Sequence, residues 1–137
     1  MTKLQTLRLQ AAFRQKWCCF YCGLPTWEND VVGYARFHGL SLRAARKLKC
    51  TAEHLIARQD GGLDTEDNIV AACWFCNNGR HRSKKPKSAA AFGTYVRSRI
   101  LRFRWHSPDI LASMLAHPEA FPPSMTSQVG AFVYNSA

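Results

Sequence analysis

The run from Thr51 to Asn78, TAEHLIARQDGGLDTEDNIVAACWFCNN, carries the signals of a complete small fold. It opens with a predicted short strand, Gly61-Gly62 predicts a turn inside a polar loop, and Ile69 to Ala72 predict a second strand. Together these segments predict a β-hairpin with a long loop. The Cys-x2-Cys pair at Cys73 to Cys76 then indicates a zinc knuckle that leads into a helix. The order strand, loop, strand, helix predicts an α+β fold.

Working outward from this run, a second Cys-x2-Cys pair precedes it, so the chain contains Cys19/Cys22 and Cys73/Cys76. Without an export signal, two such pairs favour metal thiolates over disulfides, although buried cysteines that merely fill a core are an alternative. Four thiolates complete the shell of a structural Zn²⁺ and leave no open position for a reaction. Cys18 competes with Cys19, whose spacing to Cys22 fits the knuckle better. We therefore expect a structural zinc site at the four paired cysteines.

Flanking helices are predicted on both sides of the hairpin. An amphipathic helix is expected within residues 2 to 17, and Ser41 can cap a second helix. Residues 80 to 104 contain Lys and Arg but no acid and predict a basic helix, while Ser107-Pro108 predicts the start of another that ends at His117-Pro118. The apolar residues at helical spacing are Leu9, Phe13 and Trp17 in the first helix, and Phe92, Val96, Ile100 and Phe103 in the basic one.

The charge of the chain points to a polyanionic partner. Its 137 residues include 19 Lys and Arg against nine Asp and Glu, a formal net charge of +10. Such a charge concentrates polyanions at the surface, so nucleic acid is the expected partner. The sequence contains no run of 18 apolar residues and no lipidation signal, so membrane binding is not expected. The N-terminal residues lack the apolar run of a secretory signal, so a cytoplasmic location is expected.

The same central run resembles the HNH nuclease motif. It contains an acid-His pair at Glu53-His54, the Gly-Gly loop, Asn68, and a Cys-x2-Cys followed by Asn77, with His81 beyond. The resemblance covers residues 17 to 82 and implies a treble-clef-like ββα-metal fold with one divalent metal ion. The expected domains are an HNH nuclease domain at 1–105, with its ββα core at 51–82, and a C-terminal helical appendage and tail at 106–137.

The resemblance also implies a role for each motif residue. His54 corresponds to the general base, Glu53 to a metal ligand that is more often Asp, and Asn68 to the residue that braces the hairpin loop. Asn77 stands where the last His of the motif usually falls, which makes this a His-Asn-Asn variant. His81 lies one helical turn further on, so it and Asn77 can face the same ion. The implied metal is Mg²⁺ or Mn²⁺, and an imidazole ligand widens the choice to zinc or nickel.

These residue types also suit phosphodiester hydrolysis on chemical grounds. The reaction needs a base that can take a proton from water near neutral pH, and imidazole is such a base. One tension is visible, because Glu53 and His54 are adjacent and neighbours on a regular strand point to opposite faces. The strand must therefore bend or end at this pair if both are to reach one metal ion.

Phosphate contacts supply most of the affinity for nucleic acid, and several basic residues are candidates. Arg80 could clamp the scissile phosphate from the helix that carries Asn77, and Arg58 on the hairpin loop is a second choice. The other candidates are Arg82, Lys84, Lys85 and Lys87.

The function expected from the sequence is that of a metal-dependent endonuclease acting on DNA. The runner-up is a non-catalytic zinc-knuckle protein that binds nucleic acid without cutting it, and a zinc-dependent protein-interaction module is a third alternative. His54 beside an acid favours catalysis, because a pure binding module needs no base at that place.

Overall fold

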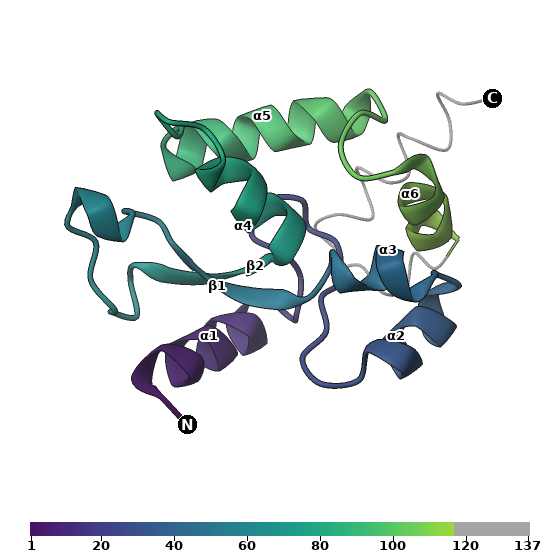
Figure 1. Cartoon of the computed structure of the whole chain (residues 1–137), viewed down its shortest axis with the longest axis horizontal. Coiled ribbons are helices and arrows are strands. Elements are labelled where there is room, and N and C mark those ends of the chain that lie inside the picture. The colour runs from purple at the N-terminus through teal and green to yellow at the C-terminus, as the bar shows by residue number, and fades with distance from the viewer. Residues whose placement is uncertain (117–137) are drawn as a thin grey trace.

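The computed structural model describes residues 1–116, which contain six α-helices, a two-stranded sheet and one 3₁₀ turn. In chain order these are α1 (Lys3–Arg14), α2 (Val31–His38), α3 (Leu42–Arg46), β1 (Cys50–His54), the 3₁₀ turn η1 (Arg58–Asp60), β2 (Ile69–Cys73), α4 (Trp74–His81), α5 (Ala89–Leu101) and α6 (Pro108–Leu115). This order confirms the expected α+β class, with a ββα core and flanking helices. In Figure 1 the sheet lies between α1 on one side and α4 and α5 on the other.

The sheet is antiparallel, with Cys50 paired to Cys73 and His54 paired to Ile69. On one face, Cys50 and Ala71 are buried against α1, which contributes Ala11 and Ala12. These small side chains allow the helix to approach the sheet closely. The opposite face of β1 meets α4 and carries polar side chains, and it is this face that positions the candidate site.

The hairpin loop begins where β1 ends. The amide of Leu55 donates to the carbonyl of Asn68 at 2.9 Å, and the amide of Gly62 donates to the carbonyl of Ala57 at 3.0 Å. Gly61 has a φ of 88°, and a Cβ added to Gly62 would lie 1.7 Å from the carbonyl oxygen of Ile56. The predicted Gly61-Gly62 turn is therefore confirmed, and its second glycine is required by a close approach of two backbone segments.

The main hydrophobic core lies at the other end of the hairpin, around the four paired cysteines. It includes Leu48 after α3, Phe92 and Val96 of α5, and Ile110 and Met114 of α6. Helix α6 therefore packs into the same core as the knuckles. Its predicted end at His117-Pro118 lies outside the described residues. No helix within residues 1–116 is both long and apolar enough to cross a membrane.

Some local predictions were wrong. Helix α1 ends at Arg14, and Phe13, expected on its apolar face, is 69 % exposed because small alanines make the contact with the sheet. Helix α2 was not expected; Asp30 caps it by accepting from the amide of Gly33 at 2.8 Å. The basic helix forms as predicted at Ala89–Leu101 but ends before Phe103, which is 43 % exposed.

Candidate active site

The four paired cysteines form one buried cluster. Their sulfur atoms all lie within 4.8 Å of one another, and the sulfurs of Cys22 and Cys73 are 3.9 Å apart. Tetrahedral zinc with Zn–S bonds of about 2.3 Å separates its sulfurs by about 3.8 Å. Cys19 belongs to the cluster, whereas the sulfur of Cys18 lies 3.5 Å from the carbonyl of Lys16. The four-cysteine cluster is thus compatible with a zinc site. Of the two adjacent cysteines, Cys19 and not Cys18 is the candidate ligand.

The chemistry of these thiols also fits a cation. Burial, followed by contacts with the neighbouring cysteines, raises the pKa of Cys22 and Cys76 well above the usual thiol value. Four thiolates cannot coexist in this buried space without a positive ion, and a metal supplies one. The indole N–H of Trp105 donates to the sulfur of Cys76 at 3.2 Å, so the cluster also has an outer hydrogen bond.

A second candidate site is an open pocket of about 280 Å³ at the end of β1, called here the His54 pocket. Because β1 ends at His54, the adjacent side chains of Glu53 and His54 both border this pocket. Asn77 and His81 reach it from α4. The lining residues are Ala52, Glu53, His54, Ala57, Arg58, Gln59, Asn77 and His81.

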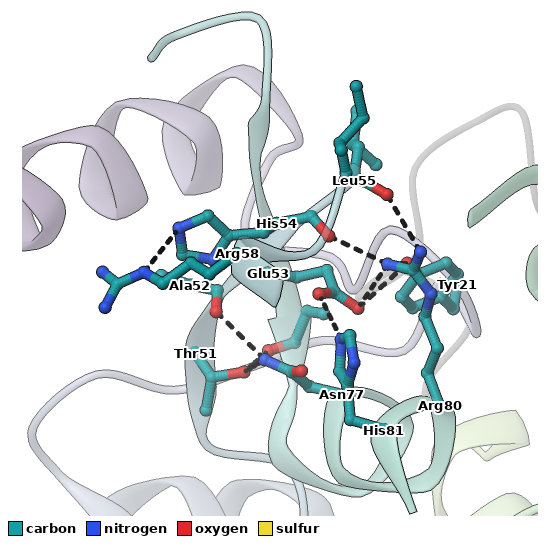
Figure 2. Close-up of polar contacts among 12 residues, drawn as sticks. Tyr21, Thr51, Ala52, Glu53, His54, Leu55, Arg58, Asn77, Arg80 and His81 are labelled. Atoms are coloured by element: carbon teal, nitrogen blue, oxygen red, sulfur yellow. Dashed lines mark hydrogen bonds and ion pairs between the residues drawn. The ribbon is translucent and has the colours of Figure 1, made fainter. Parts of the chain in front are cut away.

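Glu53 is 1 % exposed and has a different set of partners on each carboxylate oxygen. The phenol of Tyr21 donates to Oε2 at 3.0 Å, and Arg80 Nη1 lies 3.4 Å from the same oxygen. His81 Nε2 lies 2.9 Å from Oε1, and Figure 2 marks this contact with a dashed line. Burial and the charge of Glu53 raise the pKa of Tyr21 well above its usual value, so the phenol keeps its proton and can donate.

Asn77 is fixed through its amide nitrogen. Nδ2 donates to the hydroxyl of Thr51 at 3.1 Å and to the carbonyl of Ala52 at 3.0 Å (Figure 2). These two acceptors set the orientation of the amide, and within residues 1–116 its oxygen has no hydrogen-bond partner. That oxygen is therefore available as a ligand at the pocket.

Two polar atoms of the His54 pocket are spaced as two ligands of one divalent ion would be. When two ligand atoms each lie about 2.1 Å from a metal ion and their bonds form a right angle at the ion, the two atoms are about 3.0 Å apart. Glu53 Oε1 and His81 Nε2 have a similar separation of 2.9 Å. The amide oxygen of Asn77, which also lines the pocket, is a third candidate ligand. A carboxylate, an amide oxygen and an imidazole suit a hard or borderline cation and leave positions open for substrate. Within the described residues, the four-cysteine cluster is the one group of three or more His, Cys, Asp or Glu whose ligand atoms lie close enough to share an ion.

His54 is oriented by contacts at one ring nitrogen. Its Nε2 lies 2.7 Å from Asp64 Oδ1 and 3.2 Å from Arg58 Nε. A single nitrogen cannot donate to the carboxylate and accept from the guanidinium at once, so these contacts correspond to different tautomers. The hydrogen bond with His54 is the main cause that lowers the pKa of Asp64.

Asn68 holds the hairpin loop through three hydrogen bonds. Its Oδ1 accepts from the amide of Ile56 at 2.8 Å, and its Nδ2 donates to the carbonyls of Ile56 and Leu63 at 3.1 and 3.0 Å. Asn68 is 8 % exposed and does not line the His54 pocket. Its contacts are those of a residue that braces the loop.

Arg80, considered from the sequence as a phosphate clamp, is buried and only 5 % exposed. It donates to the carbonyls of His54 and Leu55, each at 2.9 Å, and to the carbonyl of Lys87 at 3.1 Å. The guanidinium therefore joins the end of β1 to the loop that follows α4 and does not face a ligand. Arg58 is exposed, and so are the remaining basic candidates, Arg82, Lys84, Lys85 and Lys87.

Sequence reasoning missed three residues that shape these sites. Tyr21 lies between two cysteines of a knuckle, Asp64 lies in a polar loop, and Trp105 follows the basic helix. Each acts through a contact between segments distant in sequence, so no local spacing marks it.

In a comparison with known protein families, residues 42–83 match the model described as HNH endonuclease. The matched segment begins in α3 and continues past α4, so it contains the hairpin, Glu53, His54 and the second cysteine pair. No curated protein and no solved structure matches the chain. Residues 42–83 are thus similar to an HNH endonuclease domain, and Cys19 and Cys22 complete the cysteine cluster from outside the matched segment.

Proposed function

We propose that this chain is a metal-dependent endonuclease that hydrolyses DNA phosphodiester bonds, with His54 as general base. The observation that carries the proposal is the meeting of Glu53, His54, Asn77 and His81 at one open pocket. HNH domains are generally nucleases, and the pocket lies in the segment that matches this family.

The proposed chemistry follows from the atoms of the site that have no hydrogen-bond partner in the described part of the chain. Nδ1 of His54 has no hydrogen-bond partner within residues 1–116 and can take a proton from a water molecule as its oxygen attacks phosphorus. The bond from phosphorus to the 3′ oxygen breaks, and that oxygen takes a proton from solvent, which leaves 5′-phosphate and 3′-hydroxyl ends. A divalent ion held by Glu53, Asn77 and His81 supplies stabilisation of the charge that develops on the phosphoryl group. Mg²⁺ or Mn²⁺ is the proposed ion, and zinc or nickel is also compatible with the imidazole.

The proposed substrate is double-stranded DNA, held by exposed basic residues around the pocket. Arg58 borders the pocket and is 62 % exposed at its side chain. The loop after α4 continues directly from His81, and the contact from Arg80 to the Lys87 carbonyl fixes it beside the end of β1. We propose that this loop contacts phosphates through Arg82, Lys84, Lys85 and Lys87.

Zn²⁺ is proposed as the ion of the four-cysteine cluster. The cluster joins the segment before α2 to the start of α4, so the ion closes the fold around the hairpin. Four thiolates leave no open position for water, and this ion therefore has a structural role.

The function is tested by nicking of supercoiled plasmid with Mg²⁺, Mn²⁺, Zn²⁺, Ni²⁺ or chelator. We expect metal-dependent nicking that is lost in His54→Ala and in Asn77→Ala. Asn78→Ala is the matched control, because it removes the same amide one position along α4 and should nick as the unchanged protein does. Equal nicking by the unchanged protein and by His54→Ala would contradict the catalytic assignment. DNA binding without cutting in every metal would favour the non-catalytic nucleic-acid-binding protein instead.

A further inference from the structure

The structure points to Asp64 as a positioning residue for His54, an inference that rests on the proposed function. The carboxylate lies 2.7 Å from His54 Nε2, closer than the 3.2 Å of Arg58 Nε at the same nitrogen. Asp64 does not line the His54 pocket, so it reaches the reaction through the imidazole and not through substrate or metal.

The contact determines which ring nitrogen is basic. A carboxylate only accepts, so the proton of a neutral His54 ring resides on Nε2 and the lone pair on Nδ1. Nδ1 is the nitrogen without a hydrogen-bond partner in the described part of the chain, and it is therefore the nitrogen that can meet water. Asp64 also places a negative charge beside the imidazolium that forms when Nδ1 takes the proton.

Arg58 is the competing partner. Its Nε lies 3.2 Å from His54 Nε2, and donation there would require the opposite tautomer, with the proton on Nδ1 and no lone pair left to act as base. Arg58 Nη2 also lies 3.3 Å from Asp64 Oδ2, so the guanidinium can be satisfied by the carboxylate alone. The shorter contact and the charge of Asp64 favour the tautomer that leaves Nδ1 basic.

Asp64 can be changed without loss of the loop, since the loop is held elsewhere. Asn68 fixes Ile56 and Leu63 by backbone contacts, and Gly62 packs on the backbone of Ile56. The Asp64 side chain is 32 % exposed and has His54 and Arg58 as its partners. A lower rate after substitution of Asp64 therefore reflects a change at the His54 imidazole and not a change in the loop.

The kinetic test compares Asp64→Asn and Asp64→Ala with Asp60→Asn, which removes an equal charge from the exposed η1 turn of the same loop. In the Asp64 variants we expect kcat to fall on the order of 10- to 100-fold, the usual effect of losing a residue that orients a functional histidine. KM for DNA should stay unchanged or decrease, because a negative charge near the substrate is removed. Asp60→Asn should keep the unchanged kcat. An equal kcat in Asp64→Asn and Asp60→Asn would overturn the inference.

A second measurement does not depend on cutting. The ¹⁵N shifts of the His54 ring, assigned with the His54→Ala spectrum, should show the Nε2–H tautomer at mildly alkaline pH in the full chain. Asp64→Ala should shift the ring toward the other tautomer, and Asp60→Asn should not. An unchanged tautomer in Asp64→Ala would refute the role of Asp64. Should the unchanged protein fail to cut DNA in every metal, the proposed function fails, while the NMR result still decides whether Asp64 orients the ring.

Discussion

The phenol of Tyr21, placed between two cysteines of the metal cluster, donates a 3.0 Å hydrogen bond to Oε2 of Glu53 in the His54 pocket. Arg80 binds both groups, with Nη1 at 3.3 Å from the phenol oxygen and 3.4 Å from Oε2. Glu53 is thereby held with Oε1 toward His81. The cysteine cluster and the pocket are connected by one buried side chain.

Loss of the Tyr21 phenol should lower both the stability of the fold and the metal affinity of the pocket. In Tyr21→Phe, a buried carboxylate oxygen loses a donor, and we expect the free energy of unfolding to fall by about 1–3 kcal/mol. The affinity of the pocket for Mn²⁺, measured by calorimetry on zinc-loaded protein, should fall several-fold. Tyr34→Phe is the matched control, since the Tyr34 phenol donates to the carbonyl of Pro25 at 2.6 Å, away from Glu53. Equal Mn²⁺ affinities in the two variants would show that Tyr21 does not position Glu53.

Adjacent cysteines should differ in their effect on zinc. We expect Cys19→Ala to lose stoichiometric zinc and cooperative unfolding, because only Cys19 of the two lies in the four-cysteine cluster. Cys18→Ala should keep one zinc per chain. Zinc content by metal analysis and thermal unfolding by circular dichroism measure both properties. Retention of zinc by Cys19→Ala together with its loss from Cys18→Ala would reverse the ligand assignment.

Two arginines that lie two residues apart, Arg80 in α4 and Arg82 at its C-cap, should have different effects. Arg80→Met removes the guanidinium that pairs with the buried Glu53 carboxylate, so we expect the free energy of unfolding to fall by about 3–5 kcal/mol. The second change Glu53→Gln should restore part of that loss. Arg82→Ala, at an exposed position, should leave stability unchanged and reduce by about one the slope of log DNA affinity against log salt. Denaturant unfolding and DNA binding at several salt concentrations test the pair, and a stable Arg80→Met protein would contradict the bracing role.

Acid should destabilise the protein through His106. Burial lowers the pKa of His106 from 6.5 to about 4, so between these values the unfolded state binds a proton that the folded state does not. Stability therefore falls as the pH decreases from 6.5 to about 4, by up to about 3 kcal/mol for this group. In His106→Asn, which suits the positive φ of 59°, that part of the slope should disappear. Unfolding is measured with zinc content monitored in parallel, and identical slopes in the two proteins would exclude His106 as the cause.

The sequence predicted the elements that depend on local patterns. The hairpin, the glycine turn, the helix after the second knuckle and the choice of Cys19 over Cys18 all follow from spacing within a short segment. Whether Glu53 and His54 could share a pocket was open, because it depends on the residue at which β1 ends.

Contacts between distant segments were not predictable in this way. The burial of Arg80 depends on acceptors from the hairpin and from Lys87, and a basic residue in a basic run looks like surface in sequence alone. Helix α2 is only eight residues long, and the local signals that mark it are the Asp30 cap at its start and Gly39 at its end. The contact between Asp64 and His54 exists because the loop returns over the end of the strand.

The guanidinium of Arg80 donates to the Tyr21 phenol oxygen, to the His54 carbonyl at the end of β1 and to the Lys87 carbonyl in the loop after α4. It therefore joins three segments that are distant in sequence. We therefore expect ligands that act on these segments to be linked thermodynamically. Binding of zinc at the cysteines should tighten the second metal, and by reciprocity the second metal should tighten zinc by the same factor. A chain that has bound one ion should therefore bind the other more tightly. At limiting metal concentration, most chains should be either fully loaded or empty, and few should hold one ion.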